Sequence, residues 1–297
     1  MTISLLQILL IQQSDFQHLE TSIDMKEIVS LSPTEREQFL KRCADLPKTR
    51  ASETITINSL DEFHKQLLEK RETGAYDSNR TVYRGVTNVK SHDLIPKIGR
   101  PHIKWKDNDW ATQETEMFRM FQERAPFYST SYPFAVNAWE NLFFAQHYGL
   151  PTRLLDWTRN PLVALYFAVA SKDEGDSALY VLKDSQIGSK NPFFDWRASK
   201  LSPLECKSFH GFDFAKVIPP SISERIVAQG GLFTIHAKPK TALEASHVDC
   251  IVIPERLRRS FKKMLHQYGI HEASIKPGFD GLCSHLFWLR TDDHAPH

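Results

Sequence analysis

One segment, residues 145–168 with the sequence AQHYGLPTRLLDWTRNPLVALYFA, constrains this chain more than any other. A His-Tyr-Gly bend is followed by the polar stretch Thr-Arg-Leu-Leu-Asp-Trp-Thr, which we expect to be rich in turns. An amphipathic helix then begins, with Asn160 as its N-cap and Pro161 as its first residue. Polar groups between two core helices are costly to bury unless each finds a partner. This density of donors and acceptors predicts a functional site.

Charge and cysteine content limit the classes of function. The chain has 37 basic and 36 acidic residues, a formal charge of +1, so no field of the whole protein attracts nucleic acid. The 4 cysteines include no Cys-x-x-Cys pair, which favours a reducing compartment without a disulfide framework or zinc knuckle. The apolar start at residues 3–11 has about half the length of a membrane helix and no basic leader. We expect a cytoplasmic protein without a membrane partner.

Two regions are expected along the chain. Residues 1–50 are interpreted as an N-terminal helical accessory segment, in which Ser32 and Glu35 flank a capping box. A polar linker at residues 48–53 separates this segment from the main domain at residues 51–297.

Within the main domain, strands and helices alternate without a regular βαβ rhythm, which predicts an α+β fold. Apolar alternation predicts strands at residues 54–57, 81–85, 178–182, 232–236 and 249–253. Helical periodicity and capping residues predict helices that begin at Ser59 and Asn160, and others at residues 114–124, 135–148, 221–229 and 255–268.

Several blocks, taken in order, resemble the FRG-domain family. The Phe-Arg-Gly triplet that names the family is present as Tyr83-Arg84-Gly85. The other matching blocks are DLIPKIGR, AQHYGLPTRLLDWT, NPLVALYFA, ERIVAQGGLFTIH and the ending IVIPERL…GI…KPGFDGL. Together they cover about residues 55–289.

The FRG domain in turn resembles, more distantly, the ADP-ribosyltransferase superfamily. That resemblance implies a split antiparallel β-sheet core with surrounding helices, and NAD as the substrate. Superfamily members have an Arg or His on a first strand, a polar turn before an A-x-x-F-A-like helix, and a Glu or Gln later. Arg84, the turn that ends at Thr158, and Gln229 fill these places, so the resemblance implies that these three residues are catalytic.

The chemistry gives each implied residue a task. Loss of nicotinamide develops an oxocarbenium-like ribose, which must be held rigidly while its charge grows. An arginine fork suits the diphosphate, and the glycine beside it would let the backbone approach the ligand. Aromatic rings could cradle the nicotinamide, and a threonine hydroxyl could bind the ribose or Arg84. The implied NAD-binding set is Tyr83, Arg84, Gly85, Arg153, Asp156, Trp157, Thr158 and Phe167.

Alternatives stay open at several of these positions. Gln229 stands where many superfamily members have Glu, and an amide cannot act as a general base. Asp156, Glu224 or His236 could supply the base instead. Arg153 could equally form a buried structural ion pair. The same ambiguity holds for three further residues: Asp156 could belong to a structural turn, Gln146 could cap a helix, and Arg100 could contact phosphate or solvent.

The expected function is that of an NAD-dependent mono-ADP-ribosyltransferase. FRG proteins resemble toxins of bacterial toxin–antitoxin and antiphage loci, which implies an RNA or protein acceptor and an antitoxin partner. RNA is favoured by the basic helix at residues 255–268. The alternative is a non-catalytic nucleotide- or nucleic-acid-binding module, and a metal-free nuclease is disfavoured because no acid–base histidine pair stands out. No metal is expected, because the 13 histidines show no His-Glu-x-x-His motif or ligand-spaced cluster.

Overall fold

A computed structural model describes residues 51–76, 80–128, 137–171, 174–183, 193–209, 211–221, 223–243 and 245–291. All of them belong to one compact unit, Pro47–His297. The accessory segment expected at residues 1–50 lies outside the described residues, and its boundary with the main domain stays a prediction.

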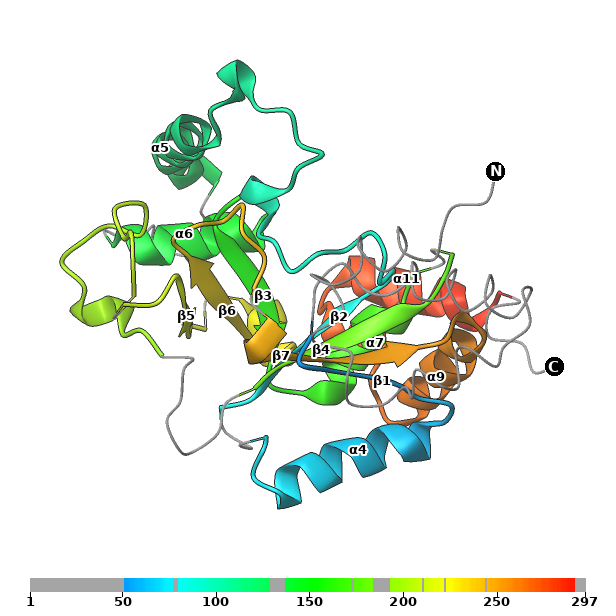
Figure 1. The fold of residues 1–297 in the computed structure, drawn as a ribbon. Coiled ribbons are helices and arrows are strands. Elements are labelled where there is room, and N and C mark those ends of the chain that lie inside the picture. The colour runs from blue at the N-terminus through cyan, green and yellow to red at the C-terminus, as the bar shows by residue number, and fades with distance from the viewer. Residues whose placement is uncertain are drawn as a thin grey trace, which may run out of the picture. The chain divides into compact units, whose positions relative to one another are not determined.

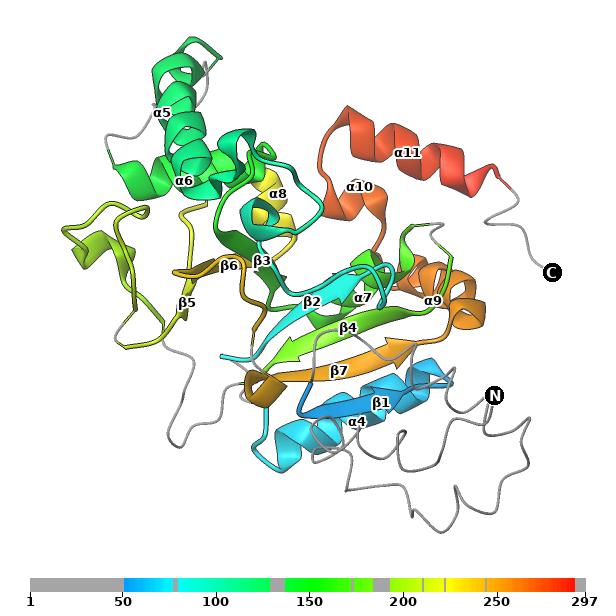
Figure 2. The ribbon, with the colours of Figure 1, turned by 45° about the horizontal axis from the view of Figure 1, so that its top comes forward.

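The core of this unit is a seven-stranded mixed sheet with the strand order β1-β7-β4-β2-β3-β6-β5 (Figure 2). Strands β1 and β7 run parallel, and every other neighbouring pair is antiparallel. The strands are β1 Glu53–Thr56, β2 Val82–Val86, β3 Leu154–Thr158, β4 Ser177–Leu182, β5 Phe214–Val217, β6 Gly231–His236 and β7 Val248–Ile253.

Eight α-helices surround the sheet in the described part of the chain (Figure 1). They are α4 Leu60–Glu72, α5 Trp110–Tyr128, α6 Ala138–His147, α7 Pro161–Val169, α8 Glu224–Ala228, α9 Glu255–Gln267, α10 Glu272–Ile275 and α11 Phe279–Leu289. None of these helices is long and apolar enough to cross a bilayer. The predicted mixture of helices and strands is confirmed, whereas an all-antiparallel sheet is wrong at the β1–β7 edge.

Different helices cover the two halves of the sheet on one face, because Tyr83 of the first core pairs with Thr158, which shares its face of β3 with Leu154 of the second. Helices α4, α7 and α9 pack on one face of β1, β7, β4 and β2, in a core that contains Phe63, Leu165 and Phe261. Helices α5 and α6 contribute to a second core on β3, β6 and β5, around Phe143 and Phe233. A third core lies on the remaining face and runs from β7 through β2 to β6.

Local capping signals predict the helix starts correctly. The Asn160 side chain accepts the Leu162 N–H at 2.9 Å, and Pro161 is the first residue of α7. Ser59 accepts the Glu62 N–H at 3.1 Å at the start of α4. These contacts satisfy backbone donors that a helix N-terminus otherwise leaves without partners.

The polar stretch before α7 is a strand, and the expectation of a turn there is wrong. Leu154–Thr158 forms β3, which pairs with β6 along its whole length. Leu154, Leu155 and Trp157 are buried on the two faces of β3, and this burial favours the extended backbone over a turn.

Candidate functional site

The strands β2 and β3 meet at a single bridge, between Tyr83 and Thr158. Beyond this bridge the antiparallel register would place Arg84 opposite Trp157, but these residues are not paired in the ladder. The two strands therefore separate there, and we call the place where they part the β2–β3 seam. Figure 2 shows β2 and β3 side by side at the junction of the two halves of the sheet.

Arg84 occupies the seam. Its Nη1 donates to the backbone carbonyl of Asp156 at 2.6 Å, where a ladder would place a strand-to-strand hydrogen bond. The same nitrogen lies 3.6 Å from the Asp156 carboxylate. Among the described residues, no acceptor contacts the buried Arg84 Nε. A guanidinium has five N–H donors, so Arg84 keeps capacity for an anionic ligand.

The charges around Arg84 sum to a locally positive site. Burial lowers the pKa of the Arg84 guanidinium, the Asp156 carboxylate opposes this, and the nearby charge of Arg100 lowers the pKa further. A guanidinium stays protonated through such shifts. Two arginines and one carboxylate therefore leave a net positive charge that favours an anion.

A polar chain connects Asp156 with helix α6. The Asp156 side chain is 60% exposed and accepts Gln146 Nε2 at 3.2 Å, and Gln146 accepts the Thr152 hydroxyl at 2.7 Å. His147 is next in the helix, and burial, followed by the charge of Arg225, lowers its pKa. Gln146 therefore holds a carboxylate at the seam in addition to its position near the end of α6.

His236 lies at the end of a buried polar chain on the same face of the sheet as Arg84. Trp157 Nε1 donates to Thr234 Oγ1 at 2.9 Å, and Thr234 Oγ1 lies 2.9 Å from His236 Nε2. Burial, with a contribution from the charge of Arg84, lowers the pKa of His236 to about 3. His236 is therefore neutral at pH 7, and Trp157 is a core residue with its N–H in use.

The other two residues of the implied catalytic set have structural contacts. The Thr158 hydroxyl donates to the Gln229 carbonyl at 2.6 Å and accepts the Asn160 N–H at 3.0 Å. Gln229 is the C-cap of α8, and its Nε2 donates to the Ile275 carbonyl of α10 at 3.1 Å. The backbones of Thr158 and Gln229 are adjacent, but the Gln229 amide binds α10.

Tyr83, Gly85 and Phe167 lie on the opposite face from Arg84, because side chains alternate along β2. Tyr83 is buried beneath α7, and Phe167 belongs to that helix. A Cβ on Gly85 would lie 1.9 Å from the Ala164 carbonyl oxygen, so glycine is required for the contact between β2 and α7. The structure does not bring these three residues together with Arg84 in one pocket.

Arg153 forms the buried ion pair that the sequence left as one alternative. Its Nε and Nη2 donate to both oxygens of Glu114, the shortest contact being 2.6 Å, and its backbone N–H donates to the same carboxylate. Both side chains are buried. This pair attaches α5 to the start of β3. The remaining nitrogen, Nη1 of Arg153, donates to the Pro203 carbonyl at 3.5 Å.

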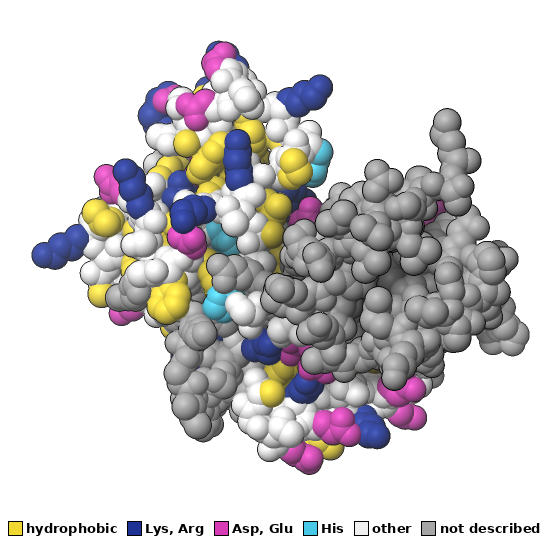
Figure 3. Space-filling model, viewed as in Figure 1, with side chains coloured by type: hydrophobic (Ala, Val, Ile, Leu, Met, Phe, Trp, Pro, Cys, Tyr) yellow, Lys and Arg dark blue, Asp and Glu magenta, His cyan; other side chains and the backbone are white. Residues whose placement is uncertain are grey.

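Two basic side chains of helix α9 bind backbone carbonyls within the protein. Arg258 is buried and donates to the Ser171 carbonyl at 2.5 Å, and Lys262 donates to the Ala170 carbonyl at 3.2 Å. These cations lie at the C-terminal end of α7, where the helix dipole favours positive charge. On the visible face in Figure 3, acidic and basic side chains are interspersed.

The fold and the seam define an α+β protein with a candidate anion-binding site. Residues 79–177 match the family model of the FRG domain, which confirms the resemblance indicated by the Tyr-Arg-Gly triplet. This match contains Arg84, Gln146 and Asp156, whereas Gln229 and His236 follow it. No curated protein and no solved structure matches the chain.

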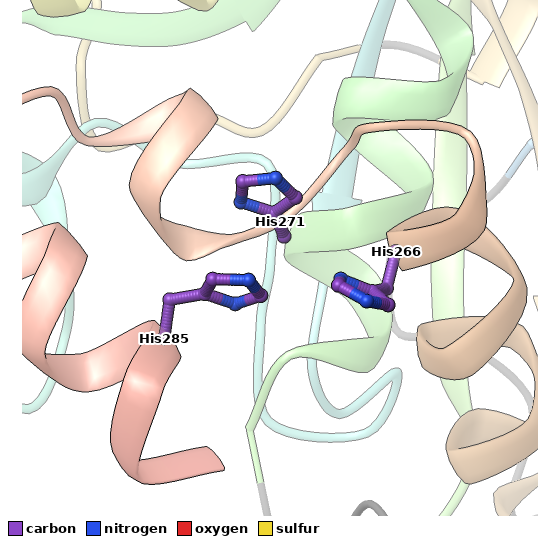
Figure 4. Close-up of side chains that lie close together, drawn as sticks. All are labelled: His266, His271 and His285. Atoms are coloured by element: carbon purple, nitrogen blue, oxygen red, sulfur yellow. The ribbon is translucent and has the colours of Figure 1, made fainter. Parts of the chain in front are cut away.

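One group of side chains was missed from the sequence. His266, His271 and His285 come from α9, the N-cap of α10 and α11, and their ring nitrogens gather in one place (Figure 4). Their separations of 5 and 14 residues make up no complete metal-binding motif, and the packing of the C-terminal elements brings them together.

Proposed function

We propose that the protein is an NAD-dependent mono-ADP-ribosyltransferase in which Arg84, with Arg100, binds the diphosphate of NAD at the β2–β3 seam. The observation that carries this proposal is the partly buried guanidinium of Arg84, whose buried Nε has no acceptor among the described residues. It lies where two strands part and beside a second arginine. A diphosphate would supply both the missing acceptor and the compensating charge.

The proposed active site differs from the set implied by the resemblance. Asp156 is the carboxylate beside Arg84, it is exposed, and Gln146 orients it. We assign to Asp156 the task of stabilising the positive ribose as nicotinamide leaves, because an oriented carboxylate favours a developing cation. Gln229 would help to position α8 through Ile275, and Thr158 would hold the turn before α7.

Binding and nicotinamide release test this proposal together. We expect Arg84→Ala to weaken NAD binding by roughly 10–100-fold, equivalent to loss of about 1.5–3 kcal/mol of charged hydrogen bonding. Arg84→Lys should restore it only in part, since an ammonium lacks the planar fork. Arg119→Ala, on the exposed face of α5, is the control for loss of one positive charge. Equal NAD affinity in the wild type and Arg84→Ala would refute the assignment.

A second candidate, a non-catalytic nucleotide-binding module, is favoured by one observation. Two of the three implied catalytic side chains, Thr158 and Gln229, are engaged in contacts within the fold. This candidate predicts NAD binding that depends on Arg84 without nicotinamide release. Under the transferase proposal, Asp156→Asn should lower release while leaving NAD binding within a few-fold of the wild type.

The biological context and the acceptor belong to the same proposal. A toxin of a bacterial defence locus would arrest growth when expressed, and Arg84→Ala would relieve the arrest. The internal contacts of Arg258 and Lys262 reduce the basic surface that favoured RNA, so RNA and protein are both tested as acceptors. Labelled NAD incubated with separate RNA and protein fractions of a lysate distinguishes them.

A further inference from the structure

Three histidines from consecutive C-terminal elements face one another, as Figure 4 shows. His266 lies in the last turn of α9, His271 is the N-cap of α10, and His285 is a buried residue of α11. One ring nitrogen of each lies within 4.8 Å of those of the other two.

The histidines line a cavity of about 250 Å³ between the C-terminal helices and α7. Tyr166 and Glu272 line it as well, and the Tyr166 hydroxyl donates to the Glu272 carboxylate. Lys276 also donates to this carboxylate, at 2.5 Å. The cavity therefore offers imidazole nitrogens and room for an ion with a bound water, whereas the Glu272 carboxylate is already paired with Lys276.

We propose that His266, His271 and His285 bind a divalent first-row transition-metal ion, with Zn²⁺ as the physiological choice. Imidazole nitrogens suit Zn²⁺, Ni²⁺ and Co²⁺, whereas Mg²⁺ and Ca²⁺ prefer oxygen. Three histidine ligands leave a fourth tetrahedral position for water. This inference is independent of the proposed transferase activity.

Binding requires a local adjustment of the rings. Those of His271 and His285 are stacked, with centroids 4.0 Å apart and planes 11° from parallel, so their in-plane lone pairs do not meet at one point. With Zn–N bonds of about 2.1 Å, tetrahedral ligand nitrogens lie about 3.4 Å apart. One ring must therefore turn and the three nitrogens must approach one another. The Ser274 N–H to His271 Nδ1 bond is long, at 3.3 Å, and is readily exchanged for a metal bond.

The ion would fasten helix α11 to the rest of the domain. This helix packs chiefly against the short helix α10 and exposes Phe279, Leu286 and Phe287. A metal that joins His285 to His266 and His271 would connect α11 directly to α9 and α10. Because the folded state alone assembles the three ligands, binding should stabilise this region.

The test uses the full chain, Zn²⁺ titration by calorimetry, and Co²⁺ as a spectroscopic probe. We expect one ion per chain, a visible d–d absorption typical of a tetrahedral Co²⁺ site, and a higher Tm in the presence of Zn²⁺. His285→Ala should lower Zn²⁺ affinity on the order of 100-fold or more, beyond what loss of an outer-shell partner costs.

A second variant keeps the experiment decisive if loss of buried His285 impairs folding. His271→Asn retains a good N-cap for α10 while removing the imidazole, and it should lower Zn²⁺ affinity and abolish the Co²⁺ band with little change in the metal-free Tm. The control is His102→Ala, an exposed histidine outside the cluster. Absence of stoichiometric binding, or binding that His271→Asn and His102→Ala alter equally, would overturn the proposal.

Discussion

The neutral, buried His236 makes the stability of this protein depend on pH in a calculable way. Its pKa in the folded state is about 3, against an ordinary value of 6.5. Between these values the unfolded chain binds a proton that the folded protein excludes, so stability falls as the pH is lowered from 6.5 towards 3. Each pH unit in this window costs about 1.4 kcal/mol.

At pH 5 His236 therefore lowers the free energy of unfolding by about 2 kcal/mol. This loss depends little on the pKa of His236 in the folded state, because pH 5 lies well above about 3. The variant His236→Gln can still accept a hydrogen bond from the Thr234 hydroxyl. Between pH 7 and pH 5 we expect its free energy of unfolding to fall by about 2 kcal/mol less than that of the wild type. The measurement is urea unfolding at both pH values, with the exposed His64→Gln as control. Other titrating groups cancel in the comparison. An identical pH dependence in wild type and His236→Gln would refute the assignment of a neutral buried imidazole.

Two further predictions concern buried contacts within the domain. Gly85→Ala should destabilise the fold by about 1–3 kcal/mol or more, because its Cβ would collide with the Ala164 carbonyl, whereas Gly231→Ala, with its nearest neighbour at 3.5 Å, should be close to neutral in thermal unfolding. Glu114→Ala should cost about 3–5 kcal/mol by leaving Arg153 buried without its carboxylate, and Glu114→Leu combined with Arg153→Met should recover part of this in denaturant unfolding. Equal stability of the Glu114→Ala and double variants would contradict that account.

The parts of the fold that the sequence predicts well are those determined by residues close together in the chain, such as helix caps. The caps at Ser59 and Asn160 act within three residues, so their side chains and partners are visible in the sequence. The strand Leu154–Thr158 was misjudged because its conformation depends on β6, whose residues lie far along the chain. The strand β5 and the helices α10 and α11 were not predicted, since they are short or carry apolar residues that face solvent.

The candidate site was likewise predicted where local motifs indicate it and missed where partners far along the chain decide it. Arg84 was selected from the Tyr-Arg-Gly triplet, and the FRG match confirms the resemblance on which that choice depended. The alternation of a strand was enough to place Tyr83 and Gly85 on the face opposite Arg84, but the helix that covers them was not known. The partners of Arg153, Thr158 and Gln229 are separated from them by 39, 71 and 46 residues, so no spacing rule could show that these groups were in use.

The Tyr-Arg-Gly triplet has linked roles that do not depend on the identity of the ligand. Gly85 permits α7 to approach β2, and the alternation of β2 then sends Arg84 to the other face. There the guanidinium, rather than the β2 backbone, satisfies the Asp156 carbonyl. A ligand that draws Arg84 away from this carbonyl must also compensate for the lost bond, so anion affinity and the attachment of β3 to β2 are thermodynamically coupled. An anion that retains the Arg84–Asp156 bond and uses only the Nε side escapes this cost. For that reason we expect the seam to bind ligands that approach Arg84 from the side of its Nε.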